Sequence, residues 1–151
     1  MGSDVKYLGP ACVTFVYLGM YYVFMLNAGV TKRLIEREYK AKDKKFDRYF
    51  GQDRRMLRAD RIHLNTLEHM VPFLGMMWLH AVYVDDVQKA TIAGIIGTCA
   101  RALYPFLLGS RKEGLGHTNT KRVYPSTMPQ YAVMIYLTQG VARRFISLSM
   151  A

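Results

Sequence analysis

Cysteine is scarce in this sequence, and its scarcity limits the kinds of site that the chain can hold. The 151 residues contain two cysteines, Cys12 and Cys99, too few for a disulfide-stapled scaffold or a multi-cysteine zinc or iron–sulfur site. The chain has four histidines: His63, His69, His80 and His117. They lack the spacing of metal ligands, and no HExxH motif occurs. We therefore expect no metal cofactor.

Acidic residues are also in the minority, with 11 Asp and Glu against 21 Lys and Arg and a net charge of +10. Twelve of the basic residues lie within 32–61 and four within 109–122. Aromatic residues at a regular stacking spacing are missing, so we expect no nucleic-acid partner. Acids alternate with bases in 32–61, which favours a solvated helical extension beside anionic headgroups.

Long apolar runs separate these basic connectors. Positions 7–31 carry no charged residue, and a helix of that length crosses about 30 Å of hydrocarbon. The alternation typical of membrane strands is missing. We predict one all-α domain over 1–151, an integral membrane four-helix bundle. Its expected spans cover 8–30, 64–84, 90–108 and 123–142.

The basic connectors also predict an orientation. Four spans place both termini and the 85–89 connector on one side, and the positive-inside rule places 32–61 and 109–122 in the cytosol. Arg143 and Arg144 weakly oppose this assignment. The N-terminus has neither a basic segment with a cleavage site nor an Arg-rich, acid-poor transit peptide. We expect a multi-pass protein of the endoplasmic reticulum, with a mitochondrial membrane as the alternative.

Several polar residues interrupt the predicted second and third spans. They are Arg61, Asn65, Glu68, Arg101 and Tyr104. A charge at a helix centre costs about 2.5–3.5 kcal/mol on insertion, so such residues normally face the bundle interior. At about 100° per residue, Arg61, Asn65 and Glu68 share one helix face, whereas His63 points away from it. Arg101 and Tyr104 are neighbours at i,i+3.

Two prolines repeat one spacing beside these residues. Pro72 follows Glu68 by four, and Pro105 follows Arg101 by four. A helical proline cannot donate to the carbonyl four residues back, so we hypothesise two kinks that open a polar cleft. Either Glu68 and Arg101 neutralise each other between helices, or the cleft binds a small zwitterionic or anionic ligand.

The stretch 61–75, Arg-Ile-His-Leu-Asn-Thr-Leu-Glu-His-Met-Val-Pro-Phe-Leu-Gly, closely resembles the second-helix motif of the MAPEG family. This family comprises the membrane-associated proteins in eicosanoid and glutathione metabolism. The resemblance is greatest to its microsomal glutathione transferase and prostaglandin E synthase branch. Four spans, a basic loop after the first and a length near 150 agree, as does Ala100-Arg101-x-x-Tyr104 in the third span.

The resemblance implies a homotrimer of four-helix bundles that binds glutathione between subunits near the cytosolic face. By position, the implied glutathione contacts are Arg61, His63, Asn65, Glu68, Arg101 and Tyr104. Arg122 is the candidate for the arginine that stabilises the thiolate, and Lys32 or Arg33 could reach the glycyl carboxylate. Leu108 stands where the third helix of the family usually has a tyrosine.

Two functions remain open from the sequence. The first is a glutathione-dependent transferase or peroxidase that acts on lipophilic electrophiles or lipid hydroperoxides from the bilayer. The second is a non-catalytic MAPEG-like subunit of a larger membrane complex. Membrane lipid, a lipophilic small molecule and further copies of the chain are the expected partners, and other membrane subunits belong to the second alternative.

Overall fold

The computed structural model describes residues 3–109 and 120–150, which are almost entirely helical. The elements are α1 (Ser3–Lys6), α2 (Leu8–Ala41), α3 (Arg54–Leu79), the π-helical turn η1 (His80–Val84), α4 (Val87–Leu107), the 3-10 turn η2 (Thr120–Val123) and α5 (Tyr124–Ser149). These described ranges contain no strand. The predicted all-α architecture with four long helices is therefore confirmed, whereas the trimer stays a prediction.

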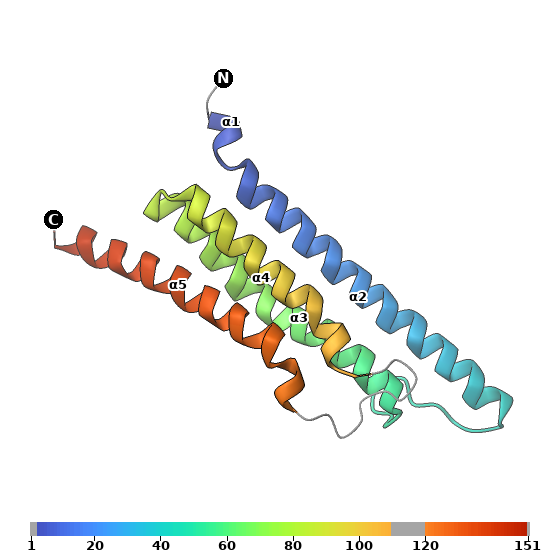
Figure 1. The fold of residues 1–151 in the computed structure, drawn as a ribbon. Coiled ribbons are helices and arrows are strands. Elements are labelled where there is room, and N and C mark those ends of the chain that lie inside the picture. Colours follow the sequence, from blue (N-terminus) through green and yellow to red (C-terminus); the bar gives the residue numbers. More distant parts are fainter. Residues whose placement is uncertain (1–2, 110–119, 151) are drawn as a thin grey trace.

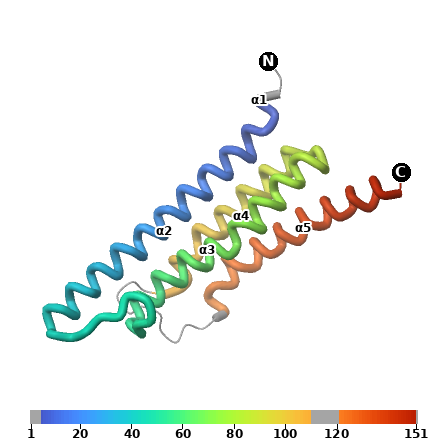
Figure 2. Tube along the Cα trace, turned by 180° about the vertical axis from the view of Figure 1, so that it is seen from behind, coloured from blue at the N-terminus to red at the C-terminus, as the bar shows by residue number. Residues whose placement is uncertain are grey.

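The four long helices run side by side as one elongated bundle (Figure 1). α3 and α4 lie between α2 and α5, as the reverse view in Figure 2 also shows. One end of the bundle, here called the terminal end, holds α1, η1 and the C-terminal turns of α5. The other end, here called the loop end, holds the 42–53 connector and η2. Both chain termini and the 85–89 connector thus share one end, as the predicted order of spans requires.

Two of the helices within the described residues, α2 and α4, are long and apolar enough to cross a membrane. α3 and α5 have 26 residues each, which corresponds to about 39 Å of helix, but both are less apolar. Large apolar side chains face outward, including Phe15, Val71 and Phe106 at 79%, 71% and 81% exposure. Exposed apolar surface on this scale indicates a membrane protein; crossing by α3 and α5 remains a prediction.

α2 extends well beyond its apolar part. Its 34 residues continue to Ala41, so about 50 Å of helix exceeds the hydrocarbon thickness. The extra turns carry alternating charges, with Glu36 Oε1 3.0 Å from Lys40 Nζ one turn later. Such i,i+4 pairs support an exposed helix. The predicted solvated helical extension is therefore present at the loop end.

The core depends on small residues of α4 that let the helices approach closely. Gly94 and Gly97 are buried, and a Cβ on Gly97 would lie 2.4 Å from Phe73 Cε2 on α3. Phe73 in turn packs against Tyr17 of α2, with ring centroids 5.3 Å apart. Close approach through small residues is a common means of packing membrane helices. It brings α2, α3 and α4 together close to the buried polar residues of the bundle.

Candidate functional site

A buried arginine lies where three helices meet. Arg101 of α4 is 0% exposed. One of its terminal nitrogens donates to Asn65 Oδ1 on α3, and the other donates to Gln130 Oε1 on α5. The planar guanidinium carries donors on separate nitrogens in a rigid fork, so it reaches both amides at once. Arg101 thus links α3, α4 and α5 through two charge-assisted hydrogen bonds.

Further polar contacts surround this arginine. The Tyr104 ring lies one turn along α4, with its centroid 5.3 Å from Arg101 Cζ. Ser126 Oγ on α5 donates to the Ala100 carbonyl over 2.7 Å. The Tyr17 hydroxyl on α2 donates to the Thr66 carbonyl over 3.3 Å. All four long helices therefore contribute polar groups to this region, here called the Arg101 centre.

The partners of the buried guanidinium are neutral. Glu68 is exposed and makes no ion pair with any residue in 3–109 or 120–150. The alternative in which Glu68 and Arg101 neutralise each other is therefore wrong, because the amides of Asn65 and Gln130 occupy the arginine. Arg101 Nε has no hydrogen-bond partner among the described residues. The centre consequently keeps an uncompensated positive charge within an apolar bundle.

The predicted stripe on α3 divides between the interior and the outer surface. Asn65 is half-buried and bonds Arg101, whereas Arg61 and Glu68 are exposed. His63 lies off the stripe, as predicted from helical geometry. Its ring lies 5.9 Å from that of Tyr21 on α2, and its buried Nδ1 has no partner among the described residues. The outer face of α3 therefore presents a basic and an acidic side chain two turns apart.

The two prolines do not interrupt their helices. Pro72 and Pro105 lie inside α3 and α4, which continue on both sides of them. The end of α4 is fastened by Arg58 of α3, which donates to the Pro105 and Gly109 carbonyls over 2.6 and 2.9 Å. Arg101 is enclosed by its neighbours instead of bordering open space. The hypothesis of a cleft opened by kinks stays a prediction.

The remaining candidate residues lie at the loop end. Lys32 Nζ lies 2.9 Å from Asp60 Oδ2, and both side chains are mostly buried. Arg33, the next residue, is exposed, as is Arg122 of η2. Arg122 precedes Val123, which packs against the buried cluster of Ile62, Tyr104 and Leu108. Lys32 is therefore engaged in an ion pair, whereas the Arg33 and Arg122 side chains are exposed to solvent or lipid headgroups. His117 lies outside the described residues.

Sequence reasoning missed Gln130 and Ser126. Both are fully buried and bond α4 from α5. The available signal was an amide within the charge-free stretch 123–142. Leu108, which stands in the usual tyrosine position, is buried at the C-cap of α4 and contacts the same cluster as Tyr104.

Comparison with known proteins supports the family resemblance of the second helix. The profile of the MAPEG family matches residues 10–122, which include α3, α4 and most of the candidate site. The comparisons match the chain to no curated protein and to no solved structure. The matched range ends before Gln130.

Proposed function

The chain belongs to the MAPEG family, and from this premise we propose that it is a glutathione-dependent membrane enzyme. The proposed activity is of the glutathione transferase or peroxidase type, with lipophilic electrophiles or lipid hydroperoxides as substrates. The proposed assembly is a homotrimer. Glutathione is a co-substrate in this proposal, and no metal takes part.

The observation that carries the proposal is the charge of the Arg101 centre. A buried arginine held by two neutral amides, and paired with no carboxylate in residues 3–109 or 120–150, creates a positive potential in a medium of low dielectric constant. Such a potential favours an anion nearby and lowers the pKa of a thiol. A thiol cofactor bound close to the centre would therefore ionise more readily than in water.

The outer face of α3 supports a zwitterionic peptide as the ligand. Arg61 and Glu68 are both exposed and are separated by about 10 Å along the helix axis. An extended tripeptide has a similar length, about 10 Å. Arg61 suits a carboxylate and Glu68 suits an ammonium group, so the two ends of one tripeptide match the two charges.

The same face supports assembly with further copies of the chain. Exposed charges on a helix inside a membrane are costly, so they normally face protein or water instead of lipid. In the proposed trimer a neighbouring copy covers α3 and closes the site between subunits. Tyr104, Asn65 and His63 then belong to the inner side of the site.

In the proposed mechanism the protein stabilises the thiolate by its positive charges and orients the two reactants. The glutathione thiolate attacks an electrophilic carbon of a lipophilic substrate that enters from the bilayer, and the C–S bond forms as the leaving group departs with its electron pair. With a lipid hydroperoxide the thiolate attacks a peroxide oxygen, the O–O bond breaks to release the lipid alcohol, and a second glutathione converts the oxidised sulfur to glutathione disulfide and water. Arg122 supplies a second positive charge, since its neighbour Val123 packs against the cluster of Ile62, Tyr104 and Leu108 and thereby anchors η2 close to the Arg101 centre. Arg33 is proposed as a further partner of the glycyl carboxylate beside Arg61, because Lys32 is paired with Asp60. Electrostatic stabilisation and orientation then provide the rate enhancement.

Thermal unfolding with and without glutathione tests the binding step. A ligand of the native state stabilises it by about 2.7 kcal/mol at 100 times its dissociation constant. We expect a rise in Tm for the wild type, a smaller rise for Arg61→Gln and Glu68→Gln, and a full rise for the exposed control Arg37→Gln. An unchanged wild-type Tm at saturating glutathione would contradict binding.

The second candidate function, a non-catalytic membrane subunit, is favoured by one observation. Both terminal nitrogens of Arg101 already have partners within the chain, so the centre can also be explained as a device that fixes helix packing. Co-purification separates the two functions. A subunit would be isolated with other proteins at a fixed stoichiometry, whereas the enzyme would be isolated as copies of one chain.

A further inference from the structure

A polar pocket of about 400 Å³ lies at the terminal end, between η1, the start of α4 and the last turns of α5. Lys89, Arg143 and Arg144 line it. Lys89 is neutralised by Asp86, whose Oδ2 lies 2.7 Å from Nζ. Neither arginine pairs with a carboxylate in residues 3–109 or 120–150, and Arg144 Nε donates to the neutral Tyr83 carbonyl. The pocket thus carries two uncompensated positive charges.

A buried histidine with an unsatisfied nitrogen lines the same pocket. His80 is 2% exposed, and its Nδ1 has no hydrogen-bond partner among the described residues. Its ring stacks on Tyr136 of α5 with centroids 5.6 Å apart. It can pack this closely because a Cβ on Gly140 would lie 2.7 Å from its Nε2. Buried polar groups normally have partners, so His80 contributes a fixed, polar ring to the wall of the pocket.

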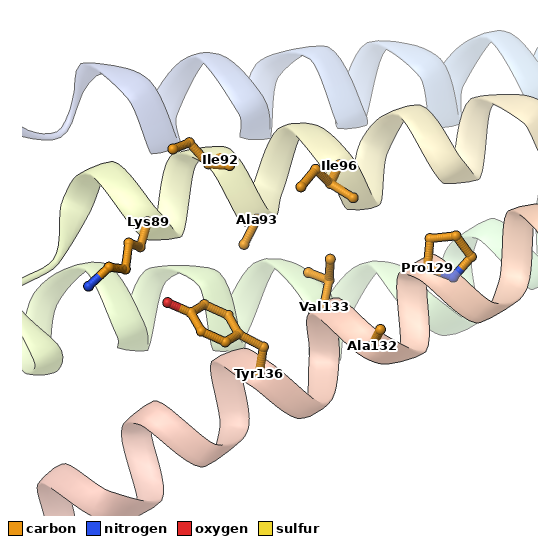
Figure 3. A pocket seen from close by; sticks show the side chains of 8 residues that line it. All are labelled: Lys89, Ile92, Ala93, Ile96, Pro129, Ala132, Val133 and Tyr136. Carbon is orange, nitrogen blue, oxygen red and sulfur yellow. The ribbon is translucent and has the colours of Figure 1, made fainter.

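An apolar groove of about 390 Å³ adjoins the polar pocket and follows the surface between α4 and α5. The two share Lys89 and Tyr136. Figure 3 shows the Tyr136 hydroxyl pointing from α5 toward α4 at the Lys89 end, with Ile96 and Val133 farther along. From Lys89 to Ile96 the helix rises about 10 Å, which accommodates part of an acyl chain.

We propose that this pocket and groove together bind one anionic membrane lipid. Its phosphate occupies the polar pocket beside Arg143, Arg144 and His80, and one acyl chain follows the groove between α4 and α5. Arginine is well suited to phosphate because its planar donors match two oxygens, and the combination of a cationic pocket with an apolar groove matches an amphiphile. The proposal also gives a role to the two arginines at the terminal end, where the positive-inside rule predicts few basic residues. It does not depend on glutathione chemistry.

Native mass spectrometry of the full chain in detergent tests this site. The probes are phosphatidylglycerol, phosphatidylcholine and free glycerol 3-phosphate. The variant Arg143→Gln/Arg144→Gln removes the two charges, and Lys44→Gln/Lys45→Gln removes two charges from the loop end as the matched control. Ala132→Trp fills the groove from the exposed face of α5 without touching the polar pocket, and thermal unfolding verifies that each variant is folded.

We expect wild type and the Lys44/Lys45 control to retain phosphatidylglycerol in preference to phosphatidylcholine. The double arginine variant should bind it about tenfold less tightly, because charge-assisted hydrogen bonds are lost, and Ala132→Trp should also weaken it. Equal retention of both lipids, or equal loss in the two double variants, would overturn the proposal. Full competition by glycerol 3-phosphate at equal concentration would overturn the lipid as occupant and indicate a site for free phosphate.

Discussion

Gln130 on α5 accepts a hydrogen bond from Arg101 on α4, 29 residues away in the chain, and both side chains are fully buried. The amide oxygen offers the guanidinium a strong acceptor without adding a negative charge. Asn65 does the same from α3. The bundle therefore holds a charged group in its interior through neutral partners, and the net positive charge remains available to act on a bound anion.

Replacing Gln130 by leucine tests the structural part of this relationship. The variant replaces the amide by an apolar side chain of similar volume and leaves one buried arginine nitrogen without an acceptor. We expect the free energy of unfolding to fall by about 1–3 kcal/mol, the desolvation cost of an unsatisfied buried donor. Denaturant titration of the detergent-solubilised protein measures the change. An unchanged stability would mean that the hydrogen bond is not formed.

Replacing Gln130 by glutamate separates structure from charge. The carboxylate retains an acceptor for Arg101, so the variant should fold. Its free energy of unfolding should be at least as high as that of Gln130→Leu. It also compensates the charge of the centre, so the rise in Tm caused by glutathione should be smaller than in wild type. A full glutathione response in this variant would argue against a role for the charge.

Gly97 offers a sharp test of the close helix packing. A Cβ there would lie 2.4 Å from Phe73 Cε2, so Gly97→Ala must displace the ring or separate α3 from α4. We expect a loss of about 1–3 kcal/mol in stability, the usual cost of overpacking. Gly19→Ala is the matched control, because a Cβ added to Gly19 would meet nothing within 4 Å. It should leave the stability unchanged or slightly raised.

The loop-end connector should be sensitive to acid. Hydrogen bonds from the backbone N–H groups of Phe50 and Tyr49 lower the pKa of Asp47. An unfolded aspartate titrates near pH 3.9, so this turn gains its full stabilisation above that pH and loses it as the pH falls through the lowered folded value. Limited proteolysis within 47–52 should therefore accelerate only in strong acid, and Asp47→Ala should show the accelerated rate already at neutral pH.

Much of the fold was predictable, because it depends on local composition. The apolar run at 7–31 and the alternating charges after it predict a long helix with a solvated extension, and α2 extends to Ala41. Helical spacing also placed Asn65 toward the interior and His63 away from the stripe. The partner of Arg101 was not predictable in the same way. Gln130 carries no charge that would mark it as a partner of Arg101, and only the packing of α5 against α4 reveals its role.

The exposure of Arg61 and Glu68 has a related explanation. Helical geometry assigns residues to a face but does not say which neighbour covers it. Within one chain the Asn65 side of the stripe meets α4, whereas Arg61 and Glu68 remain outside. In the proposed trimer a neighbouring copy would cover these two side chains, and the helical periodicity of one sequence does not predict the geometry of such an assembly.

The most direct test of the proposed function is the ultraviolet difference absorbance of the thiolate on adding glutathione to the purified protein near neutral pH. The proposal predicts a thiolate band with wild type and with the distant control Lys45→Gln, and its loss in Arg122→Ala that remains folded. No band with wild type, or an undiminished band in Arg122→Ala, would contradict the proposed activation of glutathione by this site.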